Sequence, residues 1–188
     1  MTTLTADTFD KTWRDYCEVW PLSTAQLDDI IKAHYLSKWP AIARLKLGMF
    51  MGPFVVGAIV YADAPPETSR RYGGYTWELA RLWIKDDIPR NAESWLISQS
   101  IKHIRRNHPE VMALVSYADP SAGHVGTIYR ASNWTPDGRT DDERKSPRFD
   151  YADAATGKKY GRAAHIPADA RLIRVPRVSK YRYVYRLN

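Results

Sequence analysis

One stretch, residues 78–134, alternates between strand-like and helix-like patterns and limits the possible folds more than any other. Glu78–Ile84 alternates as a strand does, and Val111–Tyr117 is a short apolar run typical of a buried parallel strand. Between them, Ala92–Arg106 places isoleucines on one face of a helix, and Pro109 ends that helix. A strand, a helix and a strand in this order predict two parallel strands joined by a right-handed crossover.

Polar side chains follow both predicted strands of this unit. Arg90, Asn91 and Ser94 come after the first strand, and Asp119 and His124 come after the second. Ligands of such units sit beyond the carboxyl ends of the strands, and a helix that begins at Asn91 has free backbone amides for an anion. We therefore consider a ligand site at this edge, although many strand–helix–strand units bind nothing there.

The remaining segments predict an α+β chain with a basic extension. An apolar face between Trp13 and Trp20, at helical or mixed spacing, ends at Pro21. The other expected elements are a helix at Ser23–Tyr35, strands at Ala41–Met51 and Phe54–Ala62 that form a hairpin, a polar loop at Asp63–Gly74, a short helix at Thr127–Trp134, a turn at Pro136–Gly138, a loop at Gly138–Asp150, a basic hairpin turn at Gly157–Gly161 and a closing strand at Lys180–Leu187. We expect a single domain spanning residues 1–188, in which residues 138–188 complete the sheet.

Composition argues against several classes of protein. No run of about 18 uninterrupted apolar residues is present, so we expect no membrane span. The single cysteine, Cys17, permits no internal disulfide, and the chain does not open on a basic-then-apolar leader. We therefore expect a protein of a reducing, cytosolic compartment.

Positive charge is concentrated at the end of the chain. The first 137 residues carry 15 basic and 15 acidic side chains, whereas residues 138–188 carry 13 and 6, so this segment holds the whole net charge of +7. The charge predicts a polyanionic partner that contacts the tail, and simple surface charge is the alternative.

Six short blocks, spread over most of the chain, carry a family resemblance. They are Ala33–Pro40, Glu78–Trp83, Pro89–Trp95, Tyr117–Pro120, Gly123–Trp134 and Lys180–Val184. Together they resemble the phage Mom-type DNA adenine modification family, which is similar in architecture to the GNAT acyltransferases. The resemblance implies a GNAT-like mixed central sheet with splayed parallel strands, flanked by helices and followed by a basic β tail. It also implies an enzyme that converts adenine N6 in double-stranded DNA to a carbamoylmethyl (acetamido) derivative, which protects the DNA from restriction.

The same resemblance assigns roles to individual residues. It implies that His34, Tyr35 and Asp119 take part in the reaction, and that Arg81, Trp83 and Tyr129 bind acetyl-CoA or a related acyl-CoA. The phosphate loop of GNAT proteins is glycine-rich, whereas residues 90–95 contain no glycine. We therefore expect the side chains of Arg90, Asn91 and Ser94 to replace the glycine amides.

Adenine N6 is a poor nucleophile, because its lone pair is delocalised into the ring. The reaction needs the base outside the stack, a group that accepts its proton and stabilisation of the developing charge. We expect Asp119 to accept the proton, Tyr35 to stack on the base, and His34 to transfer a proton or form a hydrogen bond. Structural roles stay open, because Asp119 suits a turn cap, Arg81 an ion pair and Tyr129 the core.

Two histidines and a carboxylate, His34, His124 and Asp119, also suit a non-haem iron. No tight spacing links the three residues. Iron stays open as a cofactor because the carbamoylmethyl product differs from that of a plain acetyl transfer.

Basic residues of the tail are expected to contact DNA phosphates. The candidates are Lys158, Lys159, Arg162, Arg177, Lys180 and Arg182, together with Lys38 from the front of the chain. Phosphate contacts give affinity and salt dependence rather than sequence choice, so we expect a weak sequence preference.

Two other functions and one assembly stay open at this point. The chain has features of a GNAT-like N-acyltransferase acting on tRNA, a protein amine or a small amine, and of a non-catalytic basic DNA-binding protein. Nucleoside analysis of DNA from an expressing host distinguishes the first, and substitution of Asp119 and His34 distinguishes the second. A homodimer is also compatible with the sequence.

Overall fold

The computed structural model describes residues 13–31, 40, 42–160 and 166–187. Its main element is a seven-stranded sheet in the order β1-β2-β3-β4-β5-β10-β6, in which all neighbouring strands are antiparallel except β4 and β5. These strands are β1 (Cys17–Pro21), β2 (Ala43–Met51), β3 (Phe54–Asp63), β4 (Thr76–Ile84), β5 (Ala113–Ala118), β6 (Thr135–Arg139) and β10 (Tyr181–Arg186).

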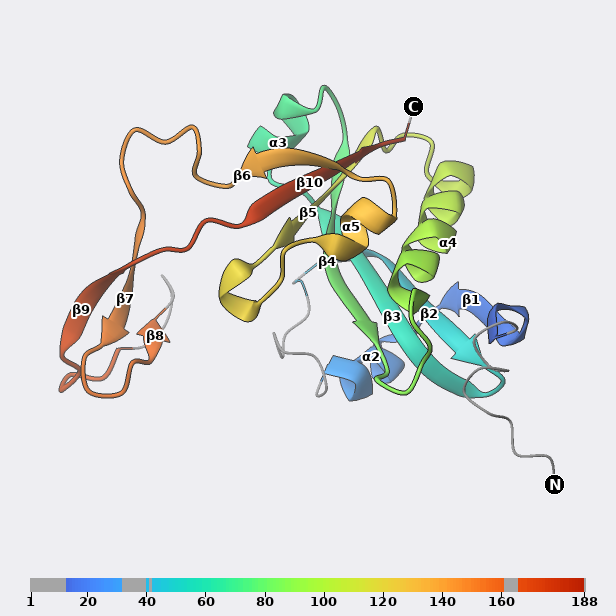
Figure 1. The fold of residues 1–188 in the computed structure, drawn as a ribbon, viewed down its shortest axis with the longest axis horizontal. Coiled ribbons are helices and arrows are strands. Elements are labelled where there is room, and N and C mark those ends of the chain that lie inside the picture. Colours follow the sequence, from blue (N-terminus) through green and yellow to red (C-terminus); the bar gives the residue numbers. More distant parts are fainter. Residues whose placement is uncertain (1–12, 32–39, 41, 161–165, 188) are drawn as a thin grey trace.

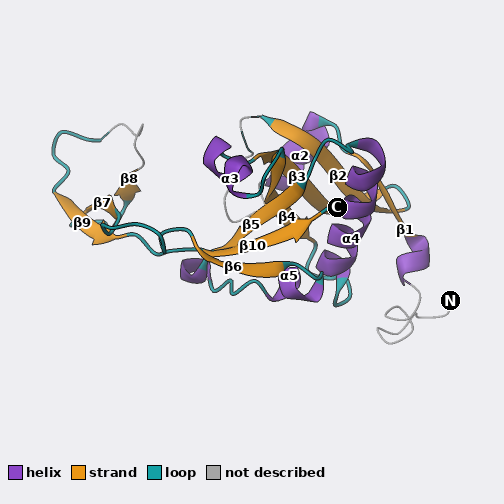
Figure 2. Cartoon of the chain, turned by 90° about the horizontal axis from the view of Figure 1, so that it is seen from above, coloured by secondary structure: helices purple, strands orange, loops and turns teal. Residues whose placement is uncertain are grey.

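Helices pack on both faces of this sheet (Figures 1 and 2). They are α2 (Thr24–Ile31), α3 (Pro66–Arg71), α4 (Ala92–Asn107) and α5 (Thr127–Ala131), with short 3-10 turns at Trp13–Tyr16 and Pro120–Ala122. Alternate residues of β3 point to opposite faces, as a strand requires. Ile59 and Tyr61 share a buried cluster with α4, whereas Ala58 and Val60 share another with α2.

The two parallel strands, β4 and β5, diverge soon after they pair. Their pairing covers Thr76 to Glu78 on β4, and β4 then continues to Ile84 with β3 as its neighbour. Just beyond the last paired residues, the Ser116 hydroxyl of β5 donates to the carbonyl of Leu79 at 2.9 Å. A side chain thus satisfies a carbonyl of β4 at the point where the ladder ends.

A second, three-stranded sheet is formed by β7 (Phe149–Asp153), β8 (Lys159–Tyr160) and β9 (Leu172–Pro176), in the order β8-β7-β9. In both Figure 1 and Figure 2 it lies apart from the main sheet, at the end of two extended connections. One connection follows β6 and the other leads into β10, which lies between β5 and β6 in the main sheet. The chain therefore leaves the main sheet and returns to it between two neighbouring strands.

The structure confirms the predicted strand–helix–strand unit and the hairpin of β2 and β3. Two local predictions are wrong. The polar loop at Asp63–Gly74 contains α3, whose first residue is Pro66, a position where the missing N–H has no helical partner in any case. The turn at Pro136–Gly138 lies inside β6, an edge strand, where proline is tolerated. The apolar segment between Trp13 and Trp20, expected at helical or mixed spacing, forms a 3-10 turn followed by β1, whose last residue is Pro21.

Two predicted helices differ in length from the elements that the structure describes. The short helix α5 ends at Ala131, before the predicted Trp134. The end of the helix predicted at Ser23–Tyr35 lies outside the described residues beyond Ile31. Within the described part of the chain, no helix is long and apolar enough to cross a membrane.

Candidate active site

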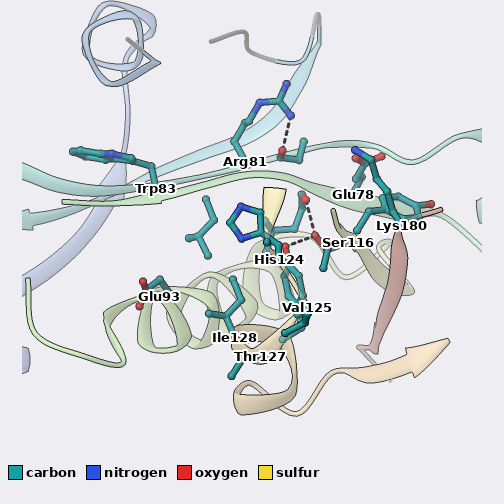
Figure 3. A pocket seen from close by; sticks show the side chains of 18 of the residues that line it. Glu78, Arg81, Trp83, Glu93, Ser116, His124, Val125, Thr127, Ile128 and Lys180 are labelled. Atoms are coloured by element: carbon teal, nitrogen blue, oxygen red, sulfur yellow. Dashed lines mark hydrogen bonds between the residues drawn. The ribbon is translucent and has the colours of Figure 1, made fainter. Parts of the chain in front are cut away.

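A cavity of about 560 Å³ lies where β4 and β5 diverge (Figure 3). Its walls are residues 78–84 of β4, residues 116–118 at the end of β5, residues 123–129 before and within α5, Glu93 of α4, and Lys180. The size suits a small-molecule or cofactor site. The divergence of β4 and β5 thus creates a space in which the lining side chains can contact a ligand.

The face of the cavity next to α4 and α5 is built from hydroxyls and apolar side chains. Tyr129 of α5 is 8% exposed, and its hydroxyl lies 2.8 Å from the Ser116 hydroxyl. Its ring also packs beside those of Trp134 and Tyr183. Tyr129 therefore belongs to the core and lines the cavity at the same time, so the two roles considered for it are compatible.

Arg81 and Trp83 line the cavity from the other side of β4. Figure 3 shows both side chains on one side of the strand, with His124, Thr127 and Ile128 on the other. Trp83 packs against the cluster that includes α2. An Arg81 guanidinium nitrogen donates to the backbone carbonyl of Ala80 at 2.6 Å. Arg81 and Trp83 thus face a different side of the cavity from Tyr129, the third residue that the resemblance assigns to an acyl-CoA.

Glu78 is a carboxylate at the point where β4 and β5 separate. Burial raises its pKa above the ordinary value, and the nearby positive charges of Arg81 and Lys180 oppose this rise. Figure 3 shows Glu78 beside Lys180. The sequence named Glu78 only as the first residue of a predicted strand and of a family block. The available signal was a carboxylate within a mostly apolar strand.

Asp119 follows β5 and is tied to Lys180. Its carboxylate accepts a hydrogen bond from the Ser121 backbone N–H at 3.0 Å, and its second oxygen lies 3.0 Å from Lys180 Nζ. Burial by itself would raise the pKa of Asp119, but the interactions with Ser121 and Lys180 outweigh burial and hold the pKa below its ordinary value. Asp119 caps the turn at Pro120–Ala122, which is the structural role considered for it.

A second hollow, of about 290 Å³, lies along α4 on its other side. Its walls include Asn91, Ser94, Trp95, Ser98 and Lys102 of α4, residues 131–133 after α5, and Arg14, Arg105 and Tyr185. Two of the three residues expected to replace a phosphate loop, Asn91 and Ser94, lie here. The third, Arg90, is exposed and borders neither the cavity nor this hollow.

Asn91 occupies the N-cap position of α4, but its side chain forms no capping hydrogen bond. Its φ of 72° lies in the left-handed region, which asparagine tolerates better than most residues. The predicted helix start is therefore correct, whereas a side-chain cap is not observed. The Ser94 hydroxyl donates instead to the Asn91 carbonyl at 3.0 Å.

The basic residues expected to contact DNA lie in different surroundings. Arg177 pairs with Asp150, and Arg182 is only 12% exposed and pairs with Asp137 at 2.8 Å. Lys180 pairs with Asp119 and lines the cavity. Lys159 lies in β8 of the three-stranded sheet, and Lys158 directly precedes that strand. His34, Tyr35, Lys38 and Arg162 lie outside the described residues.

Comparison with known proteins identifies the family. The Mom protein family matches residues 21–188. The chain belongs to the Mom protein family. The resemblance seen in the sequence blocks is therefore confirmed. A Mom relative, the protein named methylcarbamoylase mom of Escherichia phage Mu, is 39% identical over 108 residues, which are 54% of this chain and 44% of that protein. The chain thus spans less than half the length of this curated relative in the match.

Solved structures with the same fold are acetyltransferases of low sequence identity. The yncA structure of Salmonella typhimurium, with acetyl-CoA, has a TM-score of 0.55 at 13% identity and covers 92% of this chain and 94% of that one. Arabidopsis thaliana NAA60 with acetyl-CoA has a TM-score of 0.56 at 8% identity, with coverage of 90% and 98%. A GNAT family acetyltransferase of Streptococcus pneumoniae has a TM-score of 0.53 at 10% identity, with coverage of 90% and 99%. These likenesses confirm the predicted GNAT-like α+β fold for this Mom family chain.

The iron hypothesis gains no support from this Mom family structure. Among the described residues, no group of three histidine, cysteine or acidic side chains is placed to hold a metal ion. One of the three ligands considered, His34, lies outside those residues.

Proposed function

We propose that this chain is a transferase that modifies N6 of adenine in double-stranded DNA, with an acyl-CoA as donor. The acyl group must also carry an amine for the reaction to balance: N6 attacks the thioester carbonyl of an aminoacetyl donor and the CoA thiol leaves, and the amine then displaces N6 from ring carbon C6, so that N6 becomes the amide nitrogen of the carbamoylmethyl product. This product protects phage DNA from restriction in the bacterial cytoplasm. The observation that carries the proposal is the cavity between the diverging strands β4 and β5, in a chain of the Mom protein family. The phage Mu relative is named a methylcarbamoylase, which supports the chemical class.

The donor side of the site is the side next to α4 and α5. An acyl-CoA supplies an activated acyl group, and it also carries phosphates that need positive partners. Arg14, Lys102 and Arg105 border the hollow beside α4, together with Asn91 and Ser94, so this surface suits the phosphates. Glu93 faces the cavity instead, where it does not oppose them. Solved structures of this fold contain acetyl-CoA, which supports the same class of donor.

The acceptor side of the site is the side that holds Arg81 and Trp83. An adenine that leaves the duplex stack needs an aromatic or cationic surface, and these two side chains offer both next to the cavity. We therefore assign Arg81 and Trp83 to the base rather than to the donor. His34 and Tyr35, which follow α2 in the sequence, stay in the proposal as further residues of the acceptor side.

Glu78 is the better proton acceptor of the two carboxylates. A general base works best when its pKa lies near the working pH. Burial raises the pKa of Glu78, whereas Ser121 and Lys180 lower that of Asp119. We therefore propose that Glu78 accepts the proton of N6. Asp119, the residue first expected to accept the proton, acts indirectly in this proposal. Its negative charge compensates the positive charge of Lys180, which would otherwise lower the pKa of Glu78 further.

Nucleoside mass spectrometry of plasmid DNA from an expressing host tests this function. Wild-type protein is expected to produce carbamoylmethyl adenine, and Glu78→Gln to reduce its amount about a hundredfold or more, the usual contribution of a general base. Glu67→Gln, an exposed glutamate on α3, is the matched control and is expected to leave the amount unchanged.

Unmodified DNA in the presence of folded, acyl-CoA-binding wild-type protein would contradict the proposal. Full modification by Glu78→Gln would contradict the role of Glu78 alone. Modified tRNA or protein in the same cells, with unmodified DNA, would favour an acyltransferase that acts on another amine.

A further inference from the structure

The three-stranded sheet of β7, β8 and β9, described for residues 149–160 and 166–176, forms an arm that lies apart from the main sheet (Figures 1 and 2). Within the described residues its strands pair only with one another. Such a small sheet has little core of its own, so several large side chains stay exposed. Tyr151 is 50% exposed, Ile173 45%, Leu172 40% and Phe149 38%.

The base of the arm is fixed beside the cavity. Thr140 and Lys180 are joined by a backbone hydrogen bond of 3.0 Å from the Thr140 N–H to the Lys180 carbonyl. Arg177 N–H donates to the Arg148 carbonyl at 2.9 Å. Lys180 also lines the cavity. It is the fourth residue after Pro176, where β9 ends. The connections that lead to the arm therefore begin at the edge of the cavity.

The acidic groups within the strands of the arm are already engaged. Asp150 pairs with Arg177. Asp153 accepts hydrogen bonds from the backbone N–H groups of Ala155, Thr156 and Arg171, at 2.9, 2.8 and 3.1 Å. Neither carboxylate is left to offset the remaining cations of the arm, whose third described carboxylate, Asp169, is exposed and lies outside the strands.

The four described cations of the arm are Lys158, Lys159, Arg171 and Arg174. None of them has an ion-pair partner among the described residues. The Arg174 guanidinium instead lies 4.3 Å from the centre of the Phe149 ring, and Lys158 Nζ lies 5.6 Å from that of Tyr160. These contacts with rings leave the positive charges available to an anion.

The strand register gathers the aromatic side chains on one face. Tyr151 lies opposite Arg174 on β9 and opposite Tyr160 on β8, and Phe149 is two residues before Tyr151. Directly opposed residues of antiparallel strands share a face, as do residues two apart in one strand. One face of the arm therefore presents three aromatic rings and a guanidinium.

We propose that this arm binds duplex DNA next to the base that enters the cavity. The cations contact phosphates of the flanking duplex, and the aromatic face lies against the groove surface. Aromatic rings interleaved with cations suit nucleic acid, and a β-ribbon fits the major groove of duplex DNA. The inference rests on the proposed function, because that function makes duplex DNA the substrate. A second copy of the chain is a less suitable partner, because two arms of the same positive charge repel each other.

Equilibrium binding of the full chain to a 20-base-pair duplex, between 50 and 200 mM salt, tests the arm. The arm variant is Lys159→Gln, Arg171→Gln and Arg174→Gln. The control variant is Arg70→Gln, Lys85→Gln and Arg106→Gln, three cations exposed on the main body. Both variants lose three positive charges, so a difference between them reports position rather than net charge.

The arm variant is expected to bind DNA at least tenfold more weakly than the control at 100 mM salt. The slope of log K against log salt is expected to fall by about 2 to 3, since each phosphate contact contributes about 0.9. Tyr151→Ala is expected to weaken binding with little change of slope. The melting-temperature rise with acetyl-CoA is expected to be the same in all variants, which shows that the body is folded.

Equal DNA affinity of the arm variant and the control variant would overturn the inference. If both variants still modified DNA in that case, the proposed function would be unaffected. Conversely, arm-dependent binding by wild-type protein that leaves adenine unmodified would contradict the function and support the arm. A loss of self-association in the arm variant, with unchanged DNA affinity, would overturn the inference in favour of a second copy. Equal arm-dependent binding of duplex RNA would overturn the choice of DNA.

Discussion

Glu78 lines the cavity and Asp119 contacts Lys180, which also lines it, yet the pKa values of the two carboxylates are displaced in opposite directions. Burial raises the pKa of Glu78, whereas the interactions with Ser121 and Lys180 lower that of Asp119. Two carboxylates with separated pKa values usually have separate roles. Sequence could not reveal this division, because burial and the Lys180 contact depend on residues that lie far apart in the chain.

Replacement of Asp119 by asparagine tests the link between the two carboxylates. Asparagine can still cap the turn at Pro120–Ala122, but it leaves the charge of Lys180 without its partner. Lys180 then lowers the pKa of Glu78, so the acid limb of the pH–rate profile is expected to move to lower pH. The measurement is the rate of adenine modification from pH 5 to 9. Complete loss of activity at every pH would instead make Asp119 the proton acceptor.

Replacement of Glu78 by glutamine is expected to stabilise the protein at neutral pH. The pKa of Glu78 is raised in the folded state, so its contribution to the free energy of unfolding is fully present below the unfolded pKa of about 4.3 and is lost as pH rises through the folded pKa. Glutamine avoids this loss, and each unit of pKa displacement is worth about 1.4 kcal/mol.

Urea unfolding at pH 7 and pH 4 measures this effect. The variant is expected to be more stable than wild type at pH 7, and the difference is expected to shrink at pH 4. Glu67→Gln is exposed and is expected to change neither value. A variant that is less stable than wild type at pH 7 would show that Glu78 forms a favourable charged contact in the folded state.

At the scale of single elements, α4 lies between the cavity and the second hollow. In the proposed function the polar side chains of α4 that border the hollow bind the phosphate end of the donor, and the acyl end lies in the cavity. Arg14→Ala with Lys102→Ala removes two cations from the hollow without altering the cavity. The dissociation constant of acetyl-CoA is expected to rise about tenfold or more, since hydrogen bonds to charged groups contribute about 1.5–3 kcal/mol each.

Calorimetric titration measures these constants. Acetyl-pantetheine lacks the nucleotide phosphates, so its dissociation constant is expected to be the same in this variant and in wild type. Arg106→Ala, at the exposed end of α4, serves as control and is expected to bind both ligands normally. An equal loss of affinity for both ligands would place the phosphates elsewhere.

Elements with a strong local pattern were predicted from sequence, and those that depend on distant partners were not. The isoleucine spacing of α4 and the apolar run of β5 are local, and both elements lie where expected. The position of the cavity depends on where β4 separates from β5. Beyond that point β4 stays paired with β3 alone, a partner that lies far away in the sequence. The proline and glycine of β6 led to the prediction of a turn in place of an edge strand, because turns and edge strands tolerate the same residues.

At the scale of the whole molecule, the basic tail was predicted from charge alone, but the division of its cations was not. Arg177, Lys180 and Arg182 are held in ion pairs, whereas Lys159 and Arg174 are not, within the described part of the chain. The ion pair of Lys180 joins it to Asp119, which lies 61 positions earlier in the chain. The net charge of a segment therefore predicts the class of partner, and the fold decides which cations meet it.

Deletion of residues 141–179, with an Asn-Gly turn joining Thr140 to Lys180, tests the independence of the arm. β6 and β10 pair directly, Arg139 with Tyr181, and a two-residue turn suits such a pair. The shortened protein is expected to melt within a few degrees of wild type and to bind acetyl-CoA, but to bind duplex DNA at least tenfold more weakly. Thermal unfolding and DNA titration measure both effects. Loss of the acetyl-CoA response would mean that the arm supports the cavity.

The path of the chain out of β6 and back into β10 has an evolutionary consequence. Because these neighbouring strands hold each other in register, insertions and deletions between them need not disturb the walls of the cavity. The length and sequence of the outer sheet can therefore change, within what DNA binding allows, without altering the walls of the cavity. Among homologues, we expect this interval to differ most in length and composition, and Glu78, Ser116 and Tyr129 to differ least.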